Sequence, residues 1–222
     1  MGQSYGPPVV DDGLIFSLDA ANQLCYPGSD TTIYDLSGNE YSGTINLATF
    51  ESNPPSFNFP ANNANYISSD FTAQSTDFTI SIWFKDDGVR RTYERLVDKV
   101  YSTGFYLARN NNNVNSWGGG IQEGSSPYGI FITLEDGVWH NLVSLRSGTN
   151  HVIYGDGITN TNSNTVSDAP LSAATLAIGN WNTLNNSQSF GGNIAVVKYY
   201  NRALSESEIL QNYNALKGRF GR

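Results

Sequence analysis

The sequence predicts an all-β domain, an antiparallel β-sandwich with one short C-terminal helix, and three observations lead to this fold class. First, apolar residues occupy every second position along 78–84, at Phe78, Ile80, Ile82 and Phe84. A period of two is typical of a strand with two different faces. Second, clusters of Gly, Asp, Asn and Pro recur between such runs and mark turns. Third, one segment near the C-terminus carries a helix-capping pattern.

Similar short runs along the rest of the chain predict the other strands. They cover residues 104–109, 129–134, 140–146, 151–154, 175–178 and 193–200. Turn clusters separate them at 27–30, 37–39, 86–88, 135–137 and 155–157. Many short strands with turns at this spacing favour a sandwich or jelly roll. We therefore expect one domain at 13–218, an N-terminal arm or linker at 1–12 and a loose C-terminal tail at 219–222.

The single helix is expected just after Ser205. Ser205 and Glu208 stand three positions apart and form a capping-box pair. Gly218 is the predicted stop. Three apolar residues share one face of this helix: Ile209, Tyr213 and Leu216.

Composition excludes several classes of partner. The chain has 222 residues, 20 acidic and 12 basic, and a formal net charge of -8. Such a balance argues against nucleic acid and against anionic membrane surfaces. The sequence has no run of about 18 apolar residues, so we expect no membrane insertion. Residues 1–14 lack the charged and apolar regions of a signal peptide, which favours either a mature fragment or release by cell lysis, as in virus assembly.

Five segments, in order, resemble laminin G-like domains, which are concanavalin A-like jelly rolls. The matching segments lie at 14–23, 34–45, 78–85 and 136–157, and the closing one consists of 176–181 together with 190–209. Within them, the turn DLSGNEYSG and the hairpin DGVWHNLV…YGDG carry the resemblance. It implies a concanavalin A-like (laminin G-like) antiparallel jelly roll over most of the chain.

The closing strand resembles one subgroup of this family more than the others. Many family members carry an acidic pair there, where this chain has Ala195 and Val196. The segment NIAVVKYYNRALS, together with GLIFSLDAAN near the start, resembles domains in tail, fibre and capsid-associated proteins of bacteriophages. This resemblance implies a virion protein.

No catalytic residues are predicted. Endoglucanases on this fold need carboxylates at alternate positions of one strand, and no E-x-D-x-E pattern occurs. Glu135 and Asp136 are adjacent, so on a strand they would face opposite ways. The two histidines, His140 and His151, are interpreted as structural residues of the hairpin. Clustered Cys and His, which zinc sites require, are absent from the sequence.

Calcium is the one cofactor that the resemblance implies. Family members often hold it at the loop rim, and the matching opening segments place four oxygen-bearing side chains there: Asp19, Asn22, Asp35 and Asn39. Asp and Asn are also good turn formers, which is the alternative interpretation. The segment 60–66 lacks the carboxylates that the family usually has, and this weakens the calcium hypothesis.

A glycan site would combine aromatic rings with amides or carboxylates. Four residues in or beside loop-like segments are the candidates: Trp117, Tyr128, Trp181 and Asn182. Edge packing is the alternative for the two tryptophans. Trp83 and Trp139 occupy regular family positions and are expected to pack in the sandwich.

These observations favour a non-catalytic structural domain of a bacteriophage virion, exposed on the particle surface as a capsid decoration, fibre or tail module. Its expected partners are other virion proteins or further copies of itself, together with host or environmental glycans. The alternative is a carbohydrate-binding module of a bacterial secreted or surface adhesin. In that case the protein would be extracellular or on the bacterial cell surface.

Overall fold

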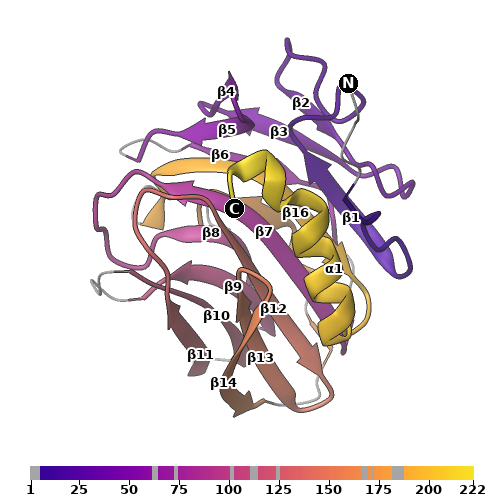
Figure 1. Ribbon diagram of the computed structural model, residues 1–222, viewed down its shortest axis with the longest axis vertical. Helices are drawn as coiled ribbons and strands as arrows, with labels where there is room; N and C mark the ends of the chain where they lie inside the picture. The colour runs from indigo at the N-terminus through magenta and orange to yellow at the C-terminus, as the bar shows by residue number, and fades with distance from the viewer. Residues whose placement is uncertain are drawn as a thin grey trace.

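The chain forms a two-layer β-sandwich with one α-helix outside it (Figure 1). The computed structural model describes residues 6–61, 65–72, 75–100, 103–110, 115–123, 126–166, 170–171, 173–181 and 188–222. Within these ranges, the strands pair antiparallel in two eight-stranded sheets. This architecture confirms the predicted all-β jelly roll with a short C-terminal helix. None of the helices in the described ranges is long and apolar enough to cross a membrane.

The first sheet carries the helix. Its strands follow the order β14-β13-β12-β7-β16-β5-β4, and β1 pairs with β16. In that order they are β14 (Ile158–Thr165), β13 (Asn150–Gly155), β12 (His140–Ser147), β7 (Phe78–Asp86), β16 (Gly192–Tyr200), β5 (Pro55–Phe59), β4 (Thr49–Ser52) and β1 (Leu14–Asp19).

The second sheet faces the first across the core. Its order is β11-β10-β9-β8-β15-β6-β3-β2. These strands are β11 (Ser126–Thr133), β10 (Ser116–Glu123), β9 (Thr103–Arg109), β8 (Arg95–Val100), β15 (Leu176–Ile178), β6 (Tyr66–Ser69), β3 (Ser42–Asn46) and β2 (Thr32–Tyr34). Strands far apart in sequence, such as β8 and β15, lie side by side, so the fold closes through long-range pairings.

The alternation along β7 sets its two faces. Phe78, Ile80, Ile82 and Phe84 point into the main core between the sheets. Trp83 points outward, yet it is buried as well, because it packs in a second apolar cluster under the C-terminal segment. Burial on both faces follows from the position of β7 at the centre of a sheet that the helix covers (Figure 1).

The helix α1 (Glu206–Leu216) begins as predicted. Ser205 caps it, and the reciprocal capping box with Glu208 is present. Its end differs from the prediction, because the chain continues through Gly218 in a 3-10 turn, η2 (Lys217–Phe220). Gly221, at φ 69°, supplies the left-handed conformation that stops the turn. The α-helix thus ends just before Gly218, where the stop was predicted, but the left-handed residue that ends the following 3-10 turn is Gly221.

The last residues pack against the first sheet and do not form a loose tail. The Phe220 ring lies 4.4 Å from Trp83 and 4.7 Å from Trp139, centroid to centroid. Arg219 and Arg222 add ion pairs to the sandwich, with N–O distances of 2.8 and 2.6 Å. Two exposed indole rings would be costly, and Phe220 removes them from water.

Part of the expected N-terminal arm also belongs to the domain. The Val10 amide donates to Asn212 Oδ1 at 2.8 Å, and the Tyr200 hydroxyl donates to the Val10 carbonyl at 3.0 Å. Gln211 reaches the Pro8 carbonyl at 2.8 Å. Residues 8–10, which belong to the arm expected at 1–12, are thus tied to α1 and β16. Residues 1–5 of the arm lie outside the described ranges.

Candidate functional site

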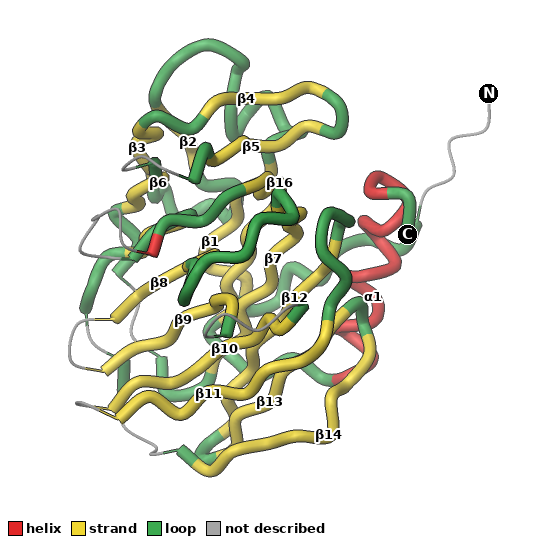
Figure 2. Tube along the Cα trace, turned by 90° about the vertical axis from the view of Figure 1, so that its left-hand side faces the viewer, coloured by secondary structure: helices red, strands yellow, loops and turns green. Residues whose placement is uncertain are grey.

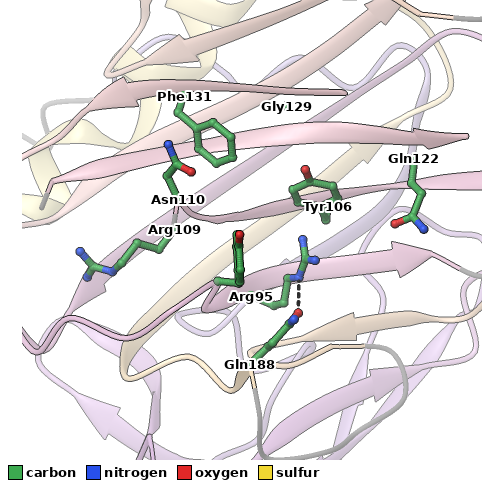
Figure 3. A pocket seen from close by; sticks show the side chains of 9 residues that line it. Arg95, Tyr106, Arg109, Asn110, Gln122, Gly129, Phe131 and Gln188 are labelled. Carbon is green, nitrogen blue, oxygen red and sulfur yellow. Dashed lines mark hydrogen bonds between the residues drawn. The ribbon is translucent and has the colours of Figure 1, made fainter. Parts of the chain in front are cut away.

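A cavity of about 420 Å³ opens on the outer face of the second sheet (Figure 3). Strands β8, β9, β10 and β11 all contribute lining residues, and these strands lie on the side of the sandwich away from α1 (Figure 2). Ligand sites in proteins commonly fall between about 300 and 1,000 Å³. The described residues that line the cavity are Tyr93, Arg95, Tyr106, Arg109, Asn110, Gln122, Gly129, Phe131 and Gln188.

Glycines make room for the aromatic side chains of this face. Gly120 is the register partner of both Tyr106 and Gly129, on either side of β10. A Cβ on Gly120 would lie 2.4 Å from the Tyr106 hydroxyl oxygen, and one on Gly129 would lie 2.7 Å from the Phe131 ring. Both contacts are too short for real carbon atoms. Glycine at these positions therefore lets the two rings occupy the sheet surface.

The polar centre of the cavity is Arg95. Its Nε donates to Gln188 Oε1 at 2.9 Å, and its guanidinium carbon lies 4.0 Å from the centroid of the Tyr106 ring. Asp98 Oδ2 is 3.5 Å from the same Nε. Burial raises the pKa of Tyr106, although the nearby Arg95 acts in the opposite direction, so the phenol stays neutral and can donate a hydrogen bond.

Arg109 lies at the edge of the cavity, and its guanidinium is already bound in a buried network of ion pairs. It donates to Glu94 at 2.7 Å, to Asp136 at 3.1 Å and to Asp86. Burial raises the pKa values of Asp86 and Glu94, while the Arg109 charge opposes that rise. Its guanidinium also lies 4.3 Å from the Trp117 ring centroid. With three carboxylates bound, Arg109 holds β7, β9 and the 135–137 turn together behind the cavity.

The described side chains that line the cavity have the chemistry of a binding site. Aspartate and glutamate do not occur among its described lining residues. Glycoside hydrolysis ordinarily requires two such carboxylates facing one bond. Aromatic rings with amide and guanidinium groups remain, and these bind hydroxyl-rich ligands.

The structure corrects one predicted glycan residue, Trp117, and places a second, Trp181, outside the cavity lining. Trp117 is 1% exposed and packs 4.8 Å from Phe84, so its ring offers no face to a sugar. Trp181 is half-buried just after β15 and does not line the cavity. Tyr128 lies in β11, but its side chain, like the whole of Asn182, is outside the described part of the chain.

Sequence reasoning missed Tyr93, Arg95, Tyr106, Phe131 and Gln188. A signal was present for two of them. Tyr106 and Phe131 lie within the strands expected at 104–109 and 129–134, and a glycine-rich run stands between those strands. Aromatic residues beside glycines on neighbouring strands favour rings lying on a sheet surface. Gln188 belongs to a distant segment, and only the folded chain brings it to the cavity.

The four expected calcium ligands have other partners. Asp19 Oδ1 accepts from Arg219 at 2.8 Å. Asp35 Oδ1 accepts two backbone amides at 2.7 and 2.9 Å, and Asn22 Oδ1 accepts one at 2.9 Å. Asn39 uses its amide nitrogen as a donor. A cation beside Asp19 and oxygens engaged with amides do not fit a cage of six to eight oxygens. Among the described residues, no group of three or more His, Cys, Asp and Glu could hold a metal ion.

Comparison with known proteins gives one family match. A family model described as the concanavalin A-like lectin/glucanases superfamily matches residues 59–210. No curated protein sequence matches the chain.

Solved structures of the same fold include toxin and enzyme domains. The binding domain of botulinum neurotoxin DC in complex with SialylT has a TM-score of 0.70 and 13% identity, covering 93% of this chain and 52% of that one. Domain 4 of AbnA, an extracellular arabinanase from Geobacillus stearothermophilus, in complex with arabinotriose, has a TM-score of 0.67 and 18% identity. That match covers 90% of this chain and 98% of the other. The chain spans about half the length of the neurotoxin binding domains it matches. At these identities the likeness is one of fold alone.

Proposed function

The chain belongs to the concanavalin A-like lectin/glucanases superfamily, and we propose that it is a non-catalytic glycan-binding domain whose site is the cavity on the second sheet. One observation carries the proposal. The cavity combines aromatic rings with amide and guanidinium groups and has no carboxylate among its described lining residues.

Each lining group has a role in this proposal. Tyr93 is 42% exposed and Phe131 is half-buried, so both rings can stack on the apolar face of a sugar. Asn110, Gln122 and Gln188 contribute amide side chains, the kind of group that pairs with sugar hydroxyls, and the Gln188 oxygen also accepts from Arg95 Nε. Tyr106 and its glycine neighbours form the floor.

Glycan binding is tested with a glycan array and a matched pair of variants. Tyr93→Ala removes an aromatic ring from the cavity. Tyr34→Ala removes a similarly exposed ring, 49%, from edge strand β2, outside the lining. We expect Tyr93→Ala to weaken binding roughly fivefold to tenfold and Tyr34→Ala to leave it unchanged. Equal effects of the two variants would count against this cavity.

The same array, run in calcium and again in chelator, tests the expected cofactor. Binding that survives chelation supports the aromatic cavity. Loss of binding in chelator would move the site to the loop rim near Asp19 and Asp35. Absence of binding across a broad array would remove glycan recognition from the proposal.

For the biological setting we propose the surface of a bacteriophage particle, as a capsid decoration, fibre or tail module in contact with other virion proteins or with further copies of itself. Its support is the resemblance of the closing strand, at 193–205, to phage structural domains. The alternative is a carbohydrate-binding module of a bacterial secreted or surface protein. The likeness to domain 4 of an extracellular arabinanase favours that alternative, because the match covers 98% of that domain. Presence of the protein in purified particles supports the first setting, and sugar binding without particles supports the second.

A further inference from the structure

Resting on the proposed glycan function, we infer that the cavity selects carboxylated sugars, such as uronic and sialic acids, over their neutral counterparts. Arg95 makes the selection. The inference concerns the class of sugar that the site takes, and it follows from how this one guanidinium is held.

Arg95 is fixed from two sides. Its Nε donates to Gln188 at 2.9 Å, and its guanidinium lies over the Tyr106 ring at 4.0 Å (Figure 3). Stacking and the Nε bond fix the plane of the group, so the other edge keeps one orientation. On that edge, Nη1 is buried and has no hydrogen-bond acceptor in the described ranges. A buried donor without an acceptor is costly, and an oxygen bound in the cavity would satisfy it.

The charged side chains that line the cavity are positively charged. Its charged lining residues, in the part of the chain that the structure describes, are Arg95 and Arg109. Arg109 already binds three carboxylates. Asp98 compensates part of the Arg95 charge, but it is fully buried, approaches the Nε side at 3.5 Å and does not line the cavity. Among the described lining residues, the Nη edge of Arg95 is therefore the cationic edge that no carboxylate occupies.

A carboxylate fits that edge better than a hydroxyl does. It carries a full negative charge and accepts two parallel N–H groups, whereas a hydroxyl accepts through one neutral oxygen. The chain as a whole, at a net charge of -8, repels anions. Attraction of an acidic sugar must then come from a close contact inside the cavity, where solvent screens the charges least.

The test uses pairs of oligosaccharides that differ only in their acidic group or in one acidic residue. Galacturonic acid trimer is compared with its methyl ester, and sialyllactose with lactose, by calorimetric titration of the whole chain. We expect at least one carboxylated member to bind about tenfold tighter than its partner. Arg95→Gln should remove the difference while leaving the weaker binding of the neutral partner.

Arg90→Gln is the matched control, because Arg90 is 52% exposed and does not line the cavity. It should keep the preference for the acid. A melting curve of Arg95→Gln checks that this variant is folded. Arg95→Lys keeps the positive charge but loses the paired N–H donors of the guanidinium, so it should bind the acidic sugar at an intermediate strength. Equal binding of both members of every pair overturns the inference and leaves glycan binding standing. A preference that survives in Arg95→Gln also overturns it. Failure of every sugar to bind overturns the proposed function as well.

Discussion

His151 should make the stability of this domain fall steeply in mild acid. The side chain is fully buried in β13, and its Nε2 is 2.9 Å from Ser144 Oγ in β12. Its Nδ1 is buried and has no hydrogen-bond partner in the described ranges. Burial, with a smaller effect from Arg146, lowers the pKa of His151 from 6.5 to about 4. The folded protein therefore holds this imidazole neutral at pH values where the unfolded chain protonates it.

The sign and the size follow from those two pKa values. Because the folded pKa lies below the unfolded one, the stabilising contribution is complete above pH 6.5 and is lost as the pH falls toward 4. A difference of about 2.5 pH units, at about 1.36 kcal/mol each, corresponds to about 3 kcal/mol. That is a large fraction of the 5–15 kcal/mol that typically holds a domain folded.

The measurement is urea unfolding of the parent chain and of His151→Gln at several pH values between 4 and 7. Glutamine keeps a polar group near Ser144 but cannot take up the proton. The parent should lose about 2–3 kcal/mol more than the variant across this range. Asp86 and Glu94, whose pKa values are raised, titrate in both proteins and cancel in the comparison. Parallel pH profiles for the two proteins would refute the reasoning.

Three further predictions concern packing. Phe220→Ala should cost about 3–5 kcal/mol and shift tryptophan emission to the red, because it uncovers two indole rings; an unshifted spectrum would contradict the packing of the C-terminal segment. Gly118→Ala should prevent stable folding, since its Cβ would meet a β11 carbonyl oxygen. Gly218→Ala should be tolerated, because its Cβ would meet nothing within 4 Å. Circular dichroism distinguishes the two outcomes. Gly129→Ala should keep the fold but weaken glycan binding, as its Cβ displaces the end of the Phe131 ring, and an unchanged affinity would place the sugar elsewhere.

The elements that local chemistry determines could be predicted from the sequence. The alternation along β7 depends on a period of two that any strand imposes, and the capping box depends on residues three positions apart. The strands that the prediction missed lack those signals. Gly118, Gly119 and Gly120 stand in the middle of β10, where glycine gives no apolar pattern, so the segment resembled a loop.

The prediction that Trp117 is exposed failed because the sequence does not give the strand register. Whether a strand residue faces the core or solvent depends on register, and a shift of one position reverses it. Pairing of Gly120 with Tyr106 turns Trp117 toward the core. The cavity also needs Gln188, which reaches β8 through the Arg95–Ser189 bridge. Pairings across such sequence separations are set by the whole fold, and a local pattern does not contain them.

Because the helix and the C-terminal segment cover the outer face of the first sheet, the two sides of the domain differ. Gly6 lies against α1 at Asn214 and Ala215, and the C-terminal segment is tied to the same face through Phe220 and Arg222. Both ends of the described chain thus lie beside α1, whereas the strands that line the cavity lie away from α1 (Figure 2). Any carrier joined at either end, whether a particle, a neighbouring domain or a sensor chip, would stand behind the domain and leave the cavity facing outward.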